Sequence, residues 1–167
     1  MNLNHLTLKT QEAVQAAQQY AFEKGHPQIE NEHLFYGLLE VDDTVLPFIF
    51  NKLQVQLPLL KQMNESALKR FSKVEGGAQV LSQKASQTLM NAIALAKKQQ
   101  DEYVATEHLL QALFESNGTL SKMLSDQGIT KKKLQDALKE LRKGEKVTSA
   151  SAEENYNALE KYAKNLN

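Results

Sequence analysis

The segment Glu30–His33, with the sequence ENEH, comes closest in this chain to a metal-binding motif. A glutamate and a histidine three residues apart share one helix face, and this Glu-x-x-His spacing is half of the paired signature of di-iron bundles. The matching later segment, Ala105–His108, has alanine at the first position, and the chain has no cysteine. The remaining histidines are His5 and His26, near a helix start and in a loop. A metal-dependent helical enzyme is therefore the most distant alternative, and we expect no metal, no cofactor and no catalytic residue.

The basic run Lys131–Lys143, with the sequence KKKLQDALKELRK, could indicate an anionic partner. Asp136 and Glu140 interleave with its lysines at helical spacing, which is typical of a solvated helix with i, i+4 charge pairs. The whole chain has 20 basic and 20 acidic side chains and a formal net charge of +0. This balance argues against a nucleic-acid or anionic-membrane binder, since both carry a basic surplus.

The composition is that of an ordinary globular protein. The chain has 167 residues, of which 41% are hydrophobic and 24% charged, enough for one domain with one core. The absence of cysteine fits a reducing compartment. The first residues, MNLNHLTLKT, lack the basic and apolar regions of a signal peptide, and no apolar run approaches the roughly 18 residues of a membrane span. We therefore expect a cytoplasmic protein that does not contact membranes.

An internal repeat organises the chain. At an offset of 75 residues Glu32, His33 and Leu34 fall on Glu107, His108 and Leu109, inside the similar segments NEHLFYGLLEV and TEHLLQALFES. Further matches occur along most of the repeat: Leu6 with Leu81, Lys9 with Lys84, Ala17 with Ala92, Ala21 with Ala96 and Leu38 with Leu113. Such a repeat decides the architecture, because two similar units can bury their apolar faces against each other.

Each copy is predicted to form four helices. The first helix opens at Thr7 or Ser82 as N-cap, follows a helical period of small and apolar residues, and stops at Gly25 in the first copy. The second has Asn31 or Thr106 as its cap. The third runs from Asp43 to about Lys52 or from Gly118 to about Asp126, and the fourth over about 58–71 or 130–142. Strand signals are weak.

The predicted fold class is therefore all-α, with two four-helix repeats related by a pseudo-twofold axis in one globular domain. Residues 1–71 form the first repeat, 72–80 the linker between repeats, and 81–143 the second repeat. Residues 144–167 are expected to be a solvated linker, ending in a short amphipathic helix (YNALEKYAKNLN) that starts a following module absent from this chain.

The paired Glu-His-Leu helices in a double four-helix repeat resemble the Clp N-terminal domain family. The segment from Gly144 onward, GEKVTSASAEEN, resembles the junction that leads into the first AAA+ module in the disaggregase members of the family. The resemblance implies a mobile domain that engages unfolded or aggregated protein during the heat response and passes it to the pore of an ATPase. Adaptor docking, as in protease-linked unfoldases, is the alternative.

The same resemblance sets the expectations for partners and cofactors. It implies a parent chain that forms a homohexamer, binds ATP and Mg²⁺, and cooperates with a DnaK-type chaperone. The sequence contains no G-x-x-x-x-G-K-[ST] phosphate loop, so this chain is not expected to hydrolyse ATP. Hexamer formation would belong to the AAA+ modules, and the chain alone is expected to be a monomer.

By motif match, the family's polar substrate-binding residues fall on Thr7, Asp101 and Glu107. Thr7 also has a structural interpretation as a helix N-cap, and Glu107 as an acid that favours a helix N-terminus. Asp101 is more informative, because its counterpart in the first copy is His26 and the repeat does not require an acid there.

An apolar groove is expected on the helix KASQTLMNAIALAKK. Its core positions include Leu89, yet Met90, Ile93 and Leu95 are apolar as well, where the first copy has Gln15, Gln18 and Tyr20. This asymmetry predicts an exposed apolar face on the second half, to which the family pattern adds Leu110 at the start of the next helix. The alternative is that these side chains pack on the last helix, against Leu134, Leu138 and Leu141.

Overall fold

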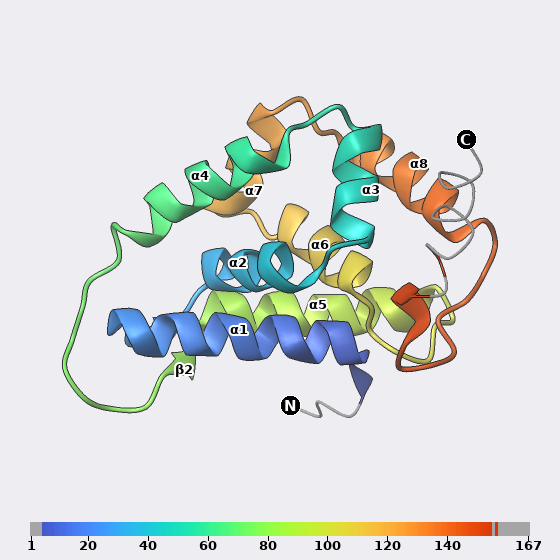
Figure 1. Ribbon diagram of the computed structural model, residues 1–167. Helices are drawn as coiled ribbons and strands as arrows, with labels where there is room; N and C mark the ends of the chain where they lie inside the picture. The colour runs from blue at the N-terminus through green and yellow to red at the C-terminus, as the bar shows by residue number, and fades with distance from the viewer. Residues whose placement is uncertain (1–4, 155, 157–167) are drawn as a thin grey trace.

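The computed structural model describes residues 5–154 and Tyr156, and it confirms an all-α fold built from two similar halves (Figure 1). The first half contains α1 (Leu8–Lys24), α2 (Asn31–Val41), α3 (Val45–Lys52) and α4 (Leu57–Leu68). The second half contains α5 (Gln83–Lys98), α6 (Thr106–Phe114), α7 (Thr119–Asp126) and α8 (Lys131–Arg142).

The first helix of each half starts where its sequence predicts, and α1 also stops at its predicted residue. Thr7 and Ser82 are the N-caps, and their hydroxyls accept hydrogen bonds from the amides of Thr10 and Ala85. Gly25 ends α1 in the left-handed conformation, at φ 71°. Ala17 and Ala21, two residues of the predicted helical period in α1, are fully buried, and so is Ala13. Small side chains at this spacing let the second helix of the half pack closely on the first.

The second helices begin one residue earlier than expected. Their N-caps are Glu30 and Ala105, so Asn31 and Thr106 are the first helical residues rather than the caps. The reason is a histidine three residues after each of these N-caps. The ring Nδ1 of His33 accepts a hydrogen bond from the Glu30 amide at 2.9 Å, and Nδ1 of His108 accepts one from the Ala105 amide at 2.8 Å. The histidines thus satisfy the amides that the expected caps would have left free.

Two short parallel strand contacts, which the sequence did not predict, cross between the halves. The strand β1 (Gln28–Ile29) pairs with β2 (Val80–Leu81), and Leu6 forms an isolated parallel bridge with Val104. The two contacts are equivalent, because a shift of 75 residues carries Leu6 to Leu81 and Ile29 to Val104. In both, the residue before the first helix of one half pairs with the residue before the second helix of the other half.

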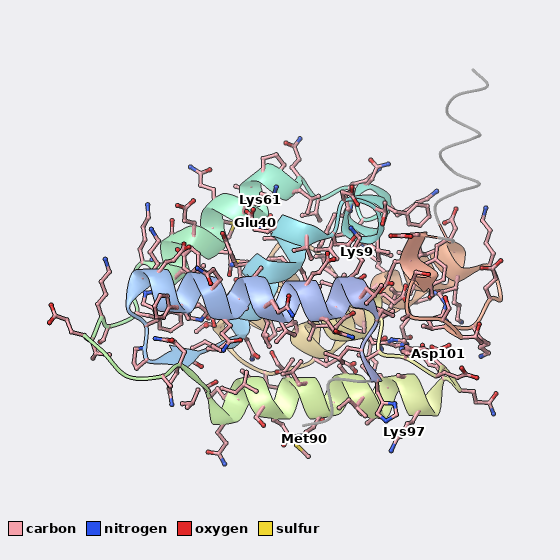
Figure 2. All side chains as sticks on the ribbon, turned by 60° about the horizontal axis from the view of Figure 1, so that its bottom comes forward. Lys9, Glu40, Lys61, Met90, Lys97 and Asp101 are labelled. Atoms are coloured by element: carbon pink, nitrogen blue, oxygen red, sulfur yellow. The ribbon has the colours of Figure 1, made fainter. Side chains whose placement is uncertain are left out.

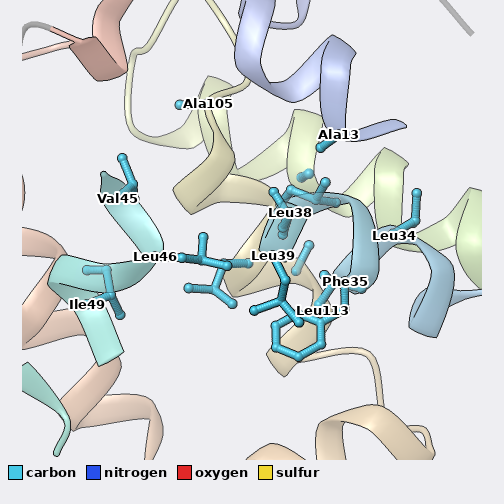
Figure 3. Close-up of a cluster of buried hydrophobic side chains, with 14 of the residues drawn as sticks. Ala13, Leu34, Phe35, Leu38, Leu39, Val45, Leu46, Ile49, Ala105 and Leu113 are labelled. Atoms are coloured by element: carbon cyan, nitrogen blue, oxygen red, sulfur yellow. The ribbon is translucent and has the colours of Figure 1, made fainter. Parts of the chain in front are cut away.

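The core lies where the halves meet. Helices α2 and α6 pack on each other at the centre, with α1 and α5 on one side and α3, α4, α7 and α8 on the other (Figure 1). Figure 3 shows the interior contributed by both halves, where Leu38 of α2, Leu46 of α3 and Leu113 of α6 are all fully buried. Helix α8 packs mainly against α3, so its leucines are engaged away from α5.

The segment after α8 differs from the solvated linker that was expected. Val147 is 0% exposed, Ala152 4% and Tyr156 8%, and Glu153 is also fully buried. Two backbone hydrogen bonds attach the segment to the domain, from the amide of Leu8 to the Ala150 carbonyl and from the amide of Glu102 to the Val147 carbonyl. A third, from the amide of Glu154 to the Ser151 carbonyl, lies within the segment itself. The segment packs because a few small or apolar residues among many polar ones meet the ends of α1 and α6. The predicted amphipathic helix beyond Tyr156 lies outside the described residues.

Candidate functional site

Three large apolar side chains are exposed, among polar residues, on the outer sides of α1 and α5. Met90 of α5 is 58% exposed and points away from the body of the molecule (Figure 2). Leu8 and Phe22 of α1 are 53% and 64% exposed. Because successive residues of a helix are rotated by about 100°, two residues fourteen apart such as Leu8 and Phe22 share one face, opposite the buried alanines. We call Leu8, Phe22, Met90 and Ile93 the outer apolar face.

The groove residues predicted from the sequence do not form one patch. Ile93 and Leu95 are both half-buried against the core, but they lie two residues apart, about 200° around the helix. They therefore flank α5 on opposite sides, and only Ile93 is on the side of Met90. Leu89 and Leu110 are each 1% exposed and belong to the core, because the seam of α5 and the start of α6 pack against the centre of the molecule.

Leu8 and Phe22 were not predicted from the sequence. The first copy has Gln15, Gln18 and Tyr20 at the positions of Met90, Ile93 and Leu95, which makes the first half look polar. Leu8 and Phe22 are fourteen residues apart, and the polar Gln15 lies midway between them on the same face, so no apolar period marks them. The outer apolar face therefore draws on both halves.

The first of the three predicted polar residues, Thr7, is fully buried and caps α1 as expected. Its hydroxyl also donates a hydrogen bond to Oε2 of Glu153. The same oxygen accepts a hydrogen bond of 3.0 Å from the backbone amide of Thr106, the first residue of α6. A carboxylate from the C-terminal segment therefore sits between the N-termini of two helices, where their dipoles favour negative charge.

Asp101 has hydrogen-bond partners that explain why an acidic residue stands at this position. Its Oδ2 accepts a hydrogen bond of 2.8 Å from Nε2 of His108, and its Oδ1 accepts hydrogen bonds from Arg142 and from the amide of Val147. Burial alone would raise the pKa of Asp101, but the hydrogen bonds from His108 and Arg142 outweigh it and hold this pKa well below its usual range. Asp101 is thus an ionised anchor between α6, α8 and the C-terminal segment.

Glu107 is 2% exposed and lies beside a cavity of about 500 Å³ whose wall includes Gln111, Lys139 and Arg142. Its Oε1 accepts a hydrogen bond of 3.2 Å from the Tyr156 hydroxyl and lies 3.7 Å from Nη1 of Arg142. Burial raises the pKa of Glu107 to about 8, against the opposing effect of Arg142. The carboxyl group is therefore largely protonated at neutral pH and can donate as well as accept a hydrogen bond.

The structure therefore brings the three polar residues together at one end of the molecule, close to the C-terminal ends of α5 and α8. What connects them is the C-terminal segment, through Glu153 on Thr7, Val147 on Asp101 and Tyr156 on Glu107. None of the three side chains is open to solvent in this arrangement. The outer apolar face, by contrast, is open.

The histidines and carboxylates give no sign of a metal centre. Both ring nitrogens of His33 are engaged, Nδ1 by the Glu30 amide and Nε2 by Nδ1 of His26 at 2.8 Å. Among residues 5–154 and Tyr156, no three or more His, Cys, Asp or Glu side chains lie close enough to hold a metal ion. Within the same residues, no helix combines the length and the apolar character needed to cross a bilayer.

Comparison with known proteins places this arrangement in a family. The model of the Clp repeat (R) N-terminal domain matches residues 5–127 and 80–161, two overlapping ranges that reflect the repeat. The chain is 42% identical over all of its 167 residues to the chaperone protein ClpB of Bacteroides thetaiotaomicron. It covers 19% of that relative, so it spans about a fifth of the length of the protein that it matches.

Solved structures agree with the fold. The N-terminal domain of Hsp104 from Candida albicans superimposes with a TM-score of 0.80 at 19% identity, over 89% of this chain and 98% of that one. A ClpV N-domain solved in complex with a VipB peptide superimposes with a TM-score of 0.68 at 16% identity, over 82% of this chain and 86% of that one. At these identities the likeness concerns the fold.

Proposed function

The chain belongs to the Clp repeat N-terminal domain family, and on this premise we propose that it is the client-binding domain of a ClpB-type chaperone. In this proposal the domain engages unfolded or aggregated polypeptide and passes it to the AAA+ pore of the parent chain. The 42% identity to a ClpB chaperone over the full length of this chain supports that branch over the ClpA and ClpC unfoldases of proteases. The parent would be a cytoplasmic homohexamer that binds ATP and Mg²⁺ and works with a DnaK-type chaperone.

The single observation that carries the proposal is the outer apolar face. Leu8, Phe22 and Met90 leave more than half of their side-chain surface in water, at 53%, 64% and 58%. Such side chains can contact the apolar side chains that an unfolded client exposes, and removing both from water is favourable. The ClpV N-domain of the same fold was solved in complex with a VipB peptide, which supports peptide binding as a role of this fold.

The chemistry of this face suits many different clients. Unfolded proteins share exposed apolar side chains but no common sequence, so the site must gain its free energy from contact area. Methionine is flexible and polarizable, and it adapts to side chains of different shape. Burying one such side chain completely contributes about 1.5–3 kcal/mol. A few partial contacts, reduced by the ordering of the bound chain, give weak and reversible binding. The polar residues Thr7, Asp101 and Glu107 are proposed to belong to the same client-binding region.

A charge at Met90 tests the proposal. We expect Met90→Glu to weaken the binding of fluorescein-labelled β-casein, an unfolded protein, by about 1 kcal/mol, or roughly fivefold in Kd. The domain itself should stay folded, because Met90 is 58% exposed. Fluorescence anisotropy measures the Kd, and circular dichroism reports the fold.

The matched control is Asn91→Glu. Asn91 is an exposed residue of the same helix, about 100° round from Met90, and the substitution adds the same charge. We expect it to leave the Kd for β-casein unchanged. An equal loss of binding in the two variants would mean that charge repulsion, rather than contact with the outer apolar face, explains the result, and an unchanged Kd for Met90→Glu would remove the proposed site.

A further inference from the structure

The C-terminal segment covers the polar residues that the proposed function assigns to client binding. We call residues 147–154 the strap. Backbone hydrogen bonds hold the strap at two places, the start of α1 and the loop before α6. The Leu8 amide, at the start of α1, donates to the Ala150 carbonyl at 2.8 Å, and the Glu102 amide, in the loop before α6, donates to the Val147 carbonyl at 2.7 Å. The Val147 amide donates in return to Oδ1 of Asp101 at 2.9 Å.

Glu153 is the anchor of the strap. Its Oε2 accepts hydrogen bonds from the Thr7 hydroxyl, at the N-cap of α1, and from the Thr106 amide, at the first residue of α6. The side chains of Thr7 and Glu153 are both 0% exposed. The strap therefore occupies the hydrogen-bonding groups of Thr7 and Thr106 as a bound peptide with an acidic side chain would.

The first half shows that the fold does not require such an occupant. By the repeat offset, Ser82 corresponds to Thr7 and Asn31 to Thr106. The backbone there is the same, because the Ser82 amide donates to the Ile29 carbonyl at 3.0 Å, as the Thr7 amide does to Val104. Within the described part of the chain, however, the Ser82 hydroxyl accepts a hydrogen bond from the Ala85 amide and donates none to a carboxylate. The equivalent position thus exists without a carboxylate seated in it.

The strap has few apolar contacts with which to hold its place. Val147 and Ala152 are its buried apolar residues, whereas Thr148 and Glu154 are exposed and Ser149 is half-exposed. Burial also raises the pKa of Glu153, which means that the charged carboxylate loses solvation when the strap docks. The strap is attached mainly by hydrogen bonds to the Asp101 carboxylate, the Thr7 hydroxyl and three backbone amides, those of Leu8, Glu102 and Thr106. A competing chain that offers the same groups can displace it.

We propose that the strap is an internal competitor for client, anchored by Glu153 at Thr7 and Thr106, and that it leaves this position when client binds. The proposal rests on the proposed function, since it regulates the same site. The outer apolar face stays open, so the strap reduces the apparent affinity through the contacts that a client would make at Thr7 and Thr106, by the fraction of molecules in which these groups are covered. It also lies directly after α8, so its release lengthens the connection between the domain and whatever follows it in a longer chain.

Two measurements on the full 167-residue chain test the proposal. The first is the Kd for fluorescein-labelled β-casein of Glu153→Ala, with Glu154→Ala as the matched control, because Glu154 is the neighbouring acid and is exposed. We expect Glu153→Ala to bind at least about threefold more tightly than the wild type, and Glu154→Ala to bind like the wild type. The second is amide hydrogen exchange of Val147 in the wild type, which reports the strap itself. Saturating β-casein should make this amide exchange at least about tenfold faster.

The outcomes separate the strap from the proposed function. If Met90→Glu weakens binding while the Val147 amide stays protected at saturating β-casein, the function stands and the strap is a permanent part of the domain. Unchanged or weaker binding of β-casein by Glu153→Ala would also overturn the proposal that the strap competes with client. If neither the wild type nor any variant binds β-casein, both proposals are wrong.

Discussion

At the scale of single residues, the two equivalent histidines show how the halves diverge while keeping one fold. His33 and His108 each use Nδ1 to accept a hydrogen bond from the N-cap amide of their helix, so the ring hydrogen must be on Nε2 in the neutral form. Nε2 then donates to the preceding loop, to Asp101 in the second half and to Nδ1 of His26 in the first. The second half has a carboxylate as acceptor, whereas the first has a second imidazole.

The imidazole pair makes the first half sensitive to acid. Burial, with a smaller contribution from His26, lowers the pKa of His33 to about 4 from an ordinary value of 6.5. Between these pH values the unfolded chain binds a proton that the folded chain excludes. Lowering the pH from 6.5 to 4 therefore reduces the free energy of unfolding.

We predict that His26→Asp reduces this loss. The substitution copies the Asp101–His108 pair into the first half. The new carboxylate can accept a hydrogen bond from Nε2 of His33 whether the ring is neutral or protonated, and its negative charge stabilises the protonated ring. Lys24 and Lys73, which lie near His26, add favourable charge. Urea unfolding at pH 7, 6 and 5 measures the effect, and the free energy of unfolding should fall less steeply with acid in the variant than in the wild type.

The control for this prediction is His5→Asp, which makes the same change at an exposed histidine of the described chain. It should leave the pH dependence as it is in the wild type. A slope in His26→Asp that equals or exceeds that of the wild type would show that the His26–His33 contact does not cause the acid sensitivity.

At the scale of elements, the contact between α1 and α2 depends on a glycine. A Cβ atom built on Gly37 would lie 1.9 Å from the carbonyl oxygen of Ala13, so the two helix backbones touch at this point. The equivalent residue of the second half is Ala112, which is buried with room for its methyl group. The equivalent helix pairs therefore do not pack at the same distance, although the sequences around them are similar.

Gly37→Ala should separate α1 from α2. In an open helix the alanine would stabilise by about 1 kcal/mol, but here it overlaps a backbone atom that cannot rotate away. We expect a net loss of about 1–3 kcal/mol in the free energy of unfolding, measured by urea denaturation. Stabilisation by this variant would mean that the helices are not in contact at Gly37.

Gly118→Ala provides the comparison for this prediction. A Cβ atom at Gly118, the N-cap of α7, would have no heavy atom within 4 Å. Gly118→Ala should lower the free energy of unfolding by less than about 1 kcal/mol, because only the capping of α7 becomes weaker.

The elements also show what could and could not be predicted from the sequence. The repeat predicts the helices and their order, because apolar periodicity and capping residues are local signals. The crossed strands are two residues long or shorter and leave no alternating pattern, so β1 and β2 could not be found. The strap could not be found either, since Val147 and Ala152 carry too little apolar surface to distinguish a docked segment from a linker. Asp101 stands out in the sequence because the first copy has His26 at its position, but no local signal indicates that His108 is its partner.

At the scale of the whole molecule, the crossed strand contacts make the two halves interdependent. Each half supplies the residue that pairs in front of the other half's second helix, through Ile29 with Leu81 and Leu6 with Val104. The approximate twofold symmetry also places α1 and α5 on one side of the central α2–α6 pair (Figure 1). As a result, the helices that carry Leu8, Phe22 and Met90 lie on the same side of the molecule, whereas the exposed Leu59 belongs to α4 on the other side (Figure 1).

The most direct test of client binding at the outer apolar face uses the methionines as probes. The chain has four, of which Met90 lies on this face, while Met63 and Met123 line a pocket of about 310 Å³ beside Glu32. The methyl groups are labelled with ¹³C, and unlabelled β-casein is added while their NMR signals are recorded. We predict that the Met90 signal shifts or broadens with added β-casein while the Met63 and Met123 signals stay in place. A response of Met63 and Met123 with an unchanged Met90 signal would place the client in that pocket and contradict the account.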